Sequence, residues 1–208
     1  DYDWFARAAE VARAPGGEPE AMRPLPRPRI GYVGAINAKL DLELLGEVGE
    51  AYPRSPLVLV GPVAQSLAQD DAFRRLRQRG NVHLIGRVSV SDVPRYMAAC
   101  DVGLLPYGDN AWTRHIHPLK MYEYLACGLP VVSTDIPAAH EEHEVIYIAG
   151  DRSAFVSAIG RALAENDAGR HRARQERARG NTWRDRVERI SELIEATLSR
   201  QRVGGTSG

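Results

Sequence analysis

The stretch from His117 to Thr134 constrains the fold more than any other part of the chain, because it predicts a loop, a helix, a tight turn and a strand in immediate succession. Pro118 suits the first position of a helix, where its missing N–H is not needed. Gly128 stands where the end of that helix needs a residue in the left-handed conformation. The apolar residues 129–132 then begin a strand. The stretch therefore predicts a helix that turns directly into a buried strand.

The same helix carries two charged residues that indicate a binding site. Lys120 and Glu123 are three residues apart, so they lie on one side of the first helical turns. The helix N-terminus beside them attracts anions. A ligand with a phosphate and a diol would satisfy both, with the phosphate on the amides and Lys120 and the hydroxyls on Glu123; a nucleotide-sugar is such a ligand. The alternative is a plain surface ion pair, worth a few tenths of a kcal/mol.

Short apolar segments alternate with helical segments along most of the chain, which predicts an α/β fold with a doubly wound parallel, Rossmann-like sheet. The apolar segments are continuous, as expected for strands that are covered on both faces. The expected strands cover residues 29–34, 56–61, 81–86, 101–105, 131–132 and 145–148. The expected helices cover residues 41–52, 67–79, 91–99, 118–127, 151–164, 168–179 and 182–199.

The chain divides into three segments at this level. Residues 1–28 are expected to be an inter-domain linker, because the prolines and glycines among them interrupt any regular element. Residues 29–200 form the α/β domain. Residues 201–208 are expected to be a disordered tail.

Three of the expected strands end in glycine, at Gly34, Gly61 and Gly86. Ligands of parallel sheets bind outside the carboxyl ends of the strands, and glycine there lets a ligand approach the backbone closely. A single glycine at a strand end is ordinary turn chemistry. Three of them, together with the helix that carries Lys120 and Glu123, predict the rim of a binding site.

Composition excludes several classes of protein. The formal net charge is zero, which gives no general attraction to nucleic acid or to an anionic membrane. The two cysteines, Cys100 and Cys127, form no metal-binding or disulfide pattern, and a cytoplasmic location is expected. Of the 27 basic residues only Lys39 and Lys120 are lysines. Where arginine is the default, a retained lysine indicates a place that needs a compact ammonium; the alternative is chance.

Several motifs together resemble one enzyme family. Residues 118–132 resemble the donor-site signature of retaining glycosyltransferases with the GT-B fold, in the group 1 or family 4-like class. The segments 32–45, 59–62, 81–87 and 100–106 follow in the order of that family's C-terminal domain, and the resemblance covers about residues 29–198. The resemblance implies one half of a GT-B glycosyltransferase, the domain that binds the nucleotide-sugar donor.

The resemblance also implies roles for individual residues. Lys120 would neutralise the donor diphosphate and Glu123 would bind the ribose hydroxyls. The backbone around Gly86 and the two residues after it would hold the base. Gly34 and the residue after it would approach the diphosphate. The donor-binding residues expected on this basis are Gly34, Ala35, Lys39, Gly61, Gly86, Arg87, Val88, Thr113, Pro118, Leu119, Lys120 and Glu123.

The chain departs from the family pattern at two places. Many members carry a glutamate eight residues before the Glu123 position, which contacts the donor sugar, and this chain has His115 there. Many also carry an arginine after the first glycine, where this chain has Ala35, and a lysine a few residues on, a role that Lys39 could fill. We take Arg114 as the substitute cation, and we predict His115 and Arg114 as the catalytic residues.

The resemblance thus implies the donor-binding half of a metal-independent glycosyltransferase that needs no cofactor and retains the anomeric configuration. Its expected partners are a nucleotide-sugar donor and an N-terminal Rossmann-like domain of the same protein, without which little transfer is expected. Two alternatives are a nucleotide-sugar epimerase of GT-B-like fold and a non-catalytic GT-B scaffold. The basic run 170–179 is expected to be the solvated side of a helix; the alternative is attachment to a membrane surface.

Overall fold

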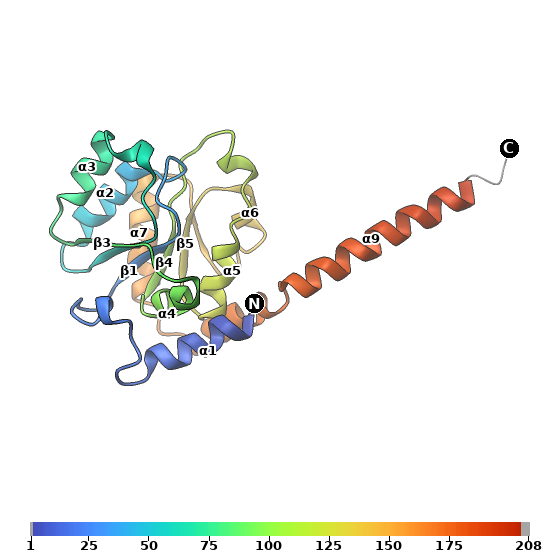
Figure 1. Cartoon of the computed structure of the whole chain (residues 1–208), viewed down its shortest axis with the longest axis horizontal. Coiled ribbons are helices and arrows are strands. Elements are labelled where there is room, and N and C mark those ends of the chain that lie inside the picture. Colours follow the sequence, from blue (N-terminus) through green and yellow to red (C-terminus); the bar gives the residue numbers. More distant parts are fainter. Residues whose placement is uncertain (1, 205–208) are drawn as a thin grey trace.

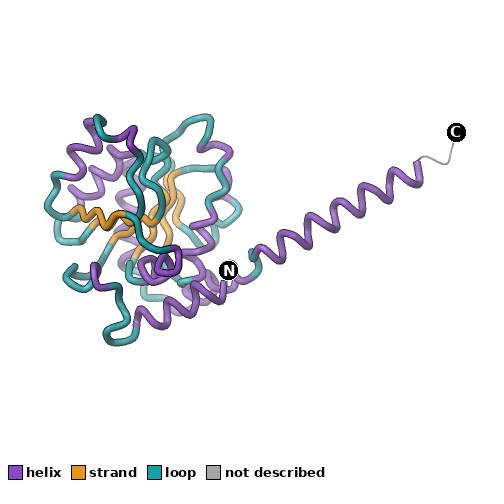
Figure 2. The backbone as a smooth tube through the Cα atoms, in the orientation of Figure 1, coloured by secondary structure: helices purple, strands orange, loops and turns teal. Residues whose placement is uncertain are grey.

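The computed structural model describes residues 2–204 and shows a six-stranded, entirely parallel sheet in the order β3-β2-β1-β4-β5-β6. The predicted doubly wound α/β fold is therefore confirmed. Figure 2 shows the strands at the centre of the body, with helices around them. The strands are β1 (Ile30–Val33), β2 (Leu57–Val60), β3 (Val82–Gly86), β4 (Val102–Leu105), β5 (Val131–Thr134) and β6 (Tyr147–Ala149).

Helices cover both faces of the sheet. On one face α2, α3 and α7 pack together, and on the other α4 and α5 pack on each other with α1 and α8 outside them (Figure 1). The helices are α1 (Tyr2–Arg13), α2 (Leu42–Ala51), α3 (Asp71–Arg77), α4 (Val93–Ala98), α5 (Leu119–Ala126), α6 (Pro137–His140), α7 (Arg152–Leu163), α8 (Ala168–Arg179) and α9 (Trp183–Gly204). Single 3-10 turns lie at Glu20–Met22, Gln65–Leu67, Val90–Asp92 and Thr113–His115.

The sheet opens between β1 and β4, where the strand order reverses. β1 pairs with β4 only at Ile30 and Gly31. Beyond that point the backbone N–H of Val33 donates to Tyr124 Oη at 2.8 Å. The ring of Tyr124 fits there because Gly103 has no side chain: a Cβ on Gly103 would lie 2.7 Å from the ring. The result is a crevice at the carboxyl ends of the two strands, the usual ligand position in such sheets.

The stretch that predicted a helix followed by a strand forms both. Pro118 is the N-cap rather than the first helical residue, because its ψ of 106° is still extended. Gly128 has φ +71°, and its N–H donates to Leu125 O at 2.8 Å while Leu129 N–H donates to Tyr124 O at 3.1 Å. These two bonds are the pattern of a helix that ends in a left-handed glycine. The predicted C-terminus of the helix is confirmed.

The expectation that residues 1–28 contain no regular element is wrong for their first half. Residues 2–13 form α1, which packs on α4 and α5 and buries Phe5, Ala9 and Ala12. These three lie four and three residues apart and so share one helical face. The proline and glycine signals begin only at residue 15. The boundary at residue 28, and a linker role for the segment, stay predictions.

The basic run in α8 is not a solvated face throughout. Arg174 is 1% exposed, and its NH1 lies 2.6 Å from Glu165 Oε1. Arg170 also pairs with Glu165, at 2.8 Å, and Arg177 pairs with the buried Glu142. Three of the five arginines of this helix are therefore paired with carboxylates of the fold, and attachment to a membrane surface stays an untested alternative.

The last helix, α9, runs away from the body (Figure 1). Its large apolar residues are exposed, among them Trp183 at 60% and Leu193 at 64%. The helix continues to Gly204, so the tail predicted at 201–208 is wrong for its first four residues, and the rest of it lies outside the described residues. Within the described chain, no helix is both long enough and apolar enough to cross a bilayer.

Candidate functional site

A cavity of about 500 Å³ lies at the carboxyl ends of β1 and β2, beside the N-terminus of α5. Nine residues predicted from the sequence line it together: Gly34, Lys39, Gly61, Arg87, Val88, Pro118, Leu119, Lys120 and Glu123. Lining residues that sequence reasoning missed are Val33, Val60, Pro62, Val90, Val93, Met97, Tyr107, Ile116 and His117. The doubly wound topology thus brings segments as far apart as residues 33 and 123 to one place.

Lys120 reaches into this cavity across the end of β1. Its Nζ lies 5.2 Å from the centroid of the Tyr32 ring. Gly34, with φ +149°, faces it, and a Cβ on Gly34 would lie 2.8 Å from both Cε and Nζ of Lys120. Glycine at position 34 is therefore what leaves room for the lysine. This contact is a more specific reason for the glycine than the turn chemistry that its position suggests.

The ammonium of Lys120 has no anionic partner among the residues that the structure describes. In the structure as described, no carboxylate forms an ion pair or hydrogen bond with it. Burial, and to a lesser extent the nearby charge of Lys39, lower the pKa of Lys120 to about 8, and Glu123 opposes this change only in part. A half-buried cation without a partner is costly. An anion bound beside it would remove that cost.

Lys39 supplies a second cation in the loop after β1. Its Nζ lies 5.9 Å from the centroid of the Tyr107 ring, and burial lowers its pKa. Backbone hydrogen bonds hold the loop: Gly108 N–H donates to Lys39 O, and Asp41 N–H donates to Pro106 O, each at 2.9 Å. Both lysines of the chain therefore line one cavity.

Glu123 lines the same cavity but does not pair with Lys120. No ion pair within 4.0 Å joins the two side chains, although they are three residues apart on α5. Burial raises the pKa of the Glu123 carboxyl, and Lys120 opposes that rise. The alternative of a plain surface ion pair is therefore wrong. The two groups point into the cavity separately, as two binding groups for one ligand would.

Tyr107 is the most informative residue that the sequence analysis missed. Its side chain is 2% exposed, and its hydroxyl has no hydrogen-bond partner among the described residues. Burial, together with the Glu123 carboxylate, raises the pKa of the phenol. The one sequence signal was its position two residues after β4, at the edge of the sheet where ligands bind.

An apolar wall completes the cavity. Val60, Val88, Val93 and Met97 belong to it, and Arg87 lies exposed at the rim. A flat ring can pack against such a wall. Ala35 and Gly86 do not line the cavity; Gly86 instead ends β3. The cavity thus offers two cations, one carboxylate and an apolar surface to a single ligand.

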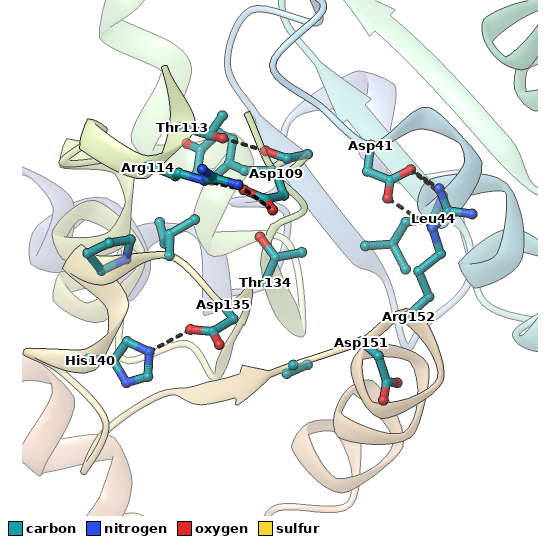
Figure 3. Close-up of a pocket in the computed structure, with 16 residues that line it drawn as sticks. Asp41, Leu44, Asp109, Thr113, Arg114, Thr134, Asp135, His140, Asp151 and Arg152 are labelled. Atoms are coloured by element: carbon teal, nitrogen blue, oxygen red, sulfur yellow. Dashed lines mark hydrogen bonds and ion pairs between the residues drawn. The ribbon is translucent and has the colours of Figure 1, made fainter. Parts of the chain in front are cut away.

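A second, larger cavity of about 710 Å³ lies beyond Tyr107, toward β5, β6 and α7. Figure 3 shows that each of its labelled cationic side chains is turned toward a carboxylate: Arg114 toward Asp109, Arg152 toward Asp41 and His140 toward Asp135. Asp41 pairs with Arg152 at 3.0 Å, and His140 Nε2 lies 2.5 Å from Asp135 Oδ1. This cavity therefore offers an anion far less free positive charge than the smaller one.

The predicted catalytic residues do not reach the smaller cavity. Arg114 lines the larger one, where its guanidinium bonds both carboxylate oxygens of Asp109 at 2.7 and 3.0 Å. His115 is exposed and lines neither cavity. Thr113 is buried, and its hydroxyl accepts from the backbone N–H of Asn110 at 3.0 Å and donates to Gly108 O, so it holds the loop. Catalytic roles for Arg114 and His115 stay predictions.

Metal binding has no evident site in the described part of the chain. No group of three or more His, Cys, Asp or Glu residues there is arranged to hold an ion.

Comparison with known proteins gives one family. The family model described as glycosyl transferases group 1 matches residues 27–165. A Bacillus subtilis protein that bears the name of a teichuronic acid biosynthesis glycosyltransferase, TuaH, is 31% identical over 159 residues, which are 74% of this chain and 40% of that protein. The chain therefore spans less than half the length of that relative.

Solved structures with the same fold support the topology. Anabaena HepE in complex with UDP has a TM-score of 0.69 at 20% identity, over 96% of this chain and 55% of that one. The UDP-forming trehalose-phosphate synthase of Burkholderia vietnamiensis has a TM-score of 0.72 at 18% identity, over 96% and 50%. Sucrose-phosphate synthase of Thermosynechococcus elongatus has a TM-score of 0.66 at 22% identity, over 92% of this chain and 49% of that one.

Proposed function

This chain belongs to the family of glycosyl transferases group 1, and on that premise we propose that it binds the nucleotide-diphosphate sugar from which the whole protein transfers a sugar to an acceptor. The family match favours glycosyl transfer over the two alternatives, an epimerase and a non-catalytic scaffold. Retention of the anomeric configuration is part of the proposal, through the sequence resemblance, and product analysis on the whole protein tests it.

One observation carries the proposal: two half-buried lysines, neither of which has an anionic partner among the described residues, line one cavity, and a glycine leaves room for one of them. Lys39 and Lys120 fit the two phosphates of a nucleoside diphosphate. Glu123, unpaired and in the same cavity, fits the ribose hydroxyls. The valines and Met97 fit the face of a base. Each part of a nucleotide-sugar donor thus has a chemical counterpart.

The chemistry proposed for this cavity is stabilisation of the leaving group. Transfer breaks the bond between the sugar and the diphosphate, and negative charge develops on the diphosphate oxygen that leaves. Two fixed ammonium groups in a partly buried cavity stabilise that charge more than water does. They would take the role that a metal ion has in other transferases, so we propose that transfer is metal-independent.

The site that binds the acceptor is not proposed to lie in this chain. The matched structures are about twice as long as this chain. We propose a second domain that closes over the cavity and supplies the acceptor site. HepE was solved with UDP, which makes uridine the first base to test.

The test is a calorimetric titration of the chain with UDP, GDP and ADP. We expect one nucleotide to bind, Lys120→Met to weaken it at least tenfold, and Glu123→Gln to weaken it less. Arg54→Met is a matched control, because Arg54 is exposed in the turn before β2. Loss of affinity in the Arg54 variant equal to that in the Lys120 variant would mean that general charge, not this cavity, binds the nucleotide. Absence of binding to any nucleotide would contradict the proposal for this chain.

A further inference from the structure

The hydroxyl of Tyr107 is a buried polar group without a hydrogen-bond partner in the described part of the chain. The side chain is 2% exposed, and the hydroxyl oxygen finds no partner within the described structure. Most buried hydroxyls in proteins are hydrogen-bonded, because leaving one unpaired costs free energy. Five of the other buried or half-buried tyrosines follow this rule: the hydroxyls of Tyr32, Tyr52, Tyr122, Tyr124 and Tyr147 each donate to an oxygen. Among the fully buried tyrosines of the described chain, Tyr107 is the exception that needs an explanation.

The backbone around Tyr107 prevents a simple escape to water. Tyr107 forms an antiparallel bridge with Leu40, and the N–H of the next residue, Gly108, donates to Lys39 O at 2.9 Å. These bonds tie the end of β4 to the loop after β1. The backbone of Tyr107 is therefore fixed against the loop after β1.

The surroundings of the ring show which kind of group the hydroxyl could meet. Tyr107 stands between the two cavities, and its two charged neighbours, Lys39 and Glu123, both line the smaller one. Lys39 lies against the ring face rather than at the hydroxyl, so it does not serve as the partner. The phenol stays protonated because burial and Glu123 disfavour its anion. It is therefore a hydrogen-bond donor beside a cation, and an anionic oxygen suits it best.

We propose that the Tyr107 hydroxyl donates a hydrogen bond to a phosphate oxygen of the diphosphate held between Lys39 and Lys120. This inference rests on the proposed function. It assigns a binding role to a residue outside the sequence signature, in the loop after β4 rather than on α5. It also explains why an unpaired hydroxyl persists in the core: the group destabilises the empty cavity and stabilises the filled one.

The test replaces Tyr107 with phenylalanine, which keeps the ring and removes only the hydroxyl. The probes are inorganic pyrophosphate, which has no base, then UDP and uridine. We expect Tyr107→Phe to weaken pyrophosphate and UDP by about 10-fold to 100-fold, as for the loss of one hydrogen bond to a charged group. Uridine affinity should not change, and the melting temperature of the empty protein should rise.

Tyr52→Phe is the matched control. The Tyr52 hydroxyl donates to Val156 O at 2.7 Å, far from the cavity, so this variant loses a satisfied bond. It should melt lower and bind pyrophosphate as the unmodified chain does. The two variants thus remove the same atom with opposite expected effects on stability.

Three results would overturn the inference. Equal pyrophosphate affinity in Tyr107→Phe and the unmodified chain would show that the hydroxyl does not contact phosphate. A parallel loss of uridine affinity would assign the hydroxyl to the nucleoside instead. If the unmodified chain bound neither pyrophosphate nor UDP, the proposed function would fail as well, so the two failures are distinguishable.

Discussion

Replacing Lys120 with methionine should stabilise the empty protein while it removes the proposed function. Methionine keeps most of the length of the lysine stem and loses the ammonium, which has no anionic partner in the described structure. Removing an uncompensated charge from a buried position relieves its desolvation cost. A binding residue maintained at a cost to stability is a frequent feature of functional sites.

The magnitude follows from the pKa of Lys120. Burial and Lys39 lower that pKa to about 8 from the ordinary value of 10.5. At about 1.4 kcal/mol for each pKa unit, keeping this lysine charged costs the folded state on the order of 3 kcal/mol at pH 7. The free energy of unfolding of Lys120→Met should exceed that of the unmodified chain by an amount up to that order.

The pH dependence of stability separately tests whether Lys120→Met is more stable than the unmodified chain. Between pH 8 and pH 10.5 the unfolded chain holds the Lys120 proton and the folded chain does not, so Lys120 makes the unmodified protein more stable as pH rises through this window. The advantage of Lys120→Met is therefore complete below pH 8 and disappears by about pH 10.5.

Urea unfolding of both proteins at pH 7, 9 and 10.5 measures this difference, with Arg54→Met as the exposed control. The control should change stability little at any of these pH values. A Lys120→Met variant that is less stable than the unmodified chain at pH 7, or an advantage that does not shrink toward pH 10.5, would refute the reasoning.

Three further predictions concern other parts of the fold. Gly34→Ala should weaken UDP binding at least tenfold and destabilise the protein by about 1 kcal/mol or more, because the new Cβ meets Lys120 at 2.8 Å and φ is +149°; calorimetry and urea unfolding measure the two effects. Arg174→Met should destabilise the protein by about 3 kcal/mol at pH 7, because it leaves the buried Glu165 without its main partner. This loss of stability should shrink below pH 4.5, where the Glu165 carboxyl of the unfolded chain becomes protonated. Urea unfolding at several pH values measures both effects. Deletion of residues 187–208 should leave the melting temperature nearly unchanged, because residues 187–197 are exposed; a fall of several degrees would show that α9 contributes to the core.

Local signals made much of the fold predictable. The strands appear as uninterrupted apolar runs, and the left-handed glycine at position 128 ends α5 where the sequence placed it. The segment α1 was missed because its buried face consists of Phe5 and two alanines, Ala9 and Ala12, which give a weak periodic signal. The prolines that follow α1, from Pro15 onward, gave a stronger signal, which indicated that no regular element is present.

The site was predictable only where one short segment carries its chemistry. Lys120 and Glu123 lie on one helix, so the sequence alone could place them together. Arg114 and His115 are close to Lys120 in sequence, but buried Thr113 turns their loop toward the larger cavity, where Arg114 meets Asp109. Sequence spacing holds no information about such a turn.

Tyr107 is a site residue that the sequence could not identify. An aromatic residue after a strand is ordinary, and the sequence cannot show whether its hydroxyl has a partner. Only the structure reveals that the hydroxyl is buried and unpaired. The same holds for Gly34, whose role became specific when the side chain of Lys120 was found opposite it.

The most direct test of the anion site is the number of protons taken up when UDP binds. Titrations at pH 8.5 in two buffers of different ionisation enthalpy measure that number. Because the pKa of Lys120 is about 8 in the empty cavity, more than half of these side chains are uncharged at pH 8.5, and bound diphosphate should recharge them. The account predicts uptake of about half a proton or more for each UDP bound, falling toward pH 7. Binding at pH 8.5 without proton uptake would contradict it.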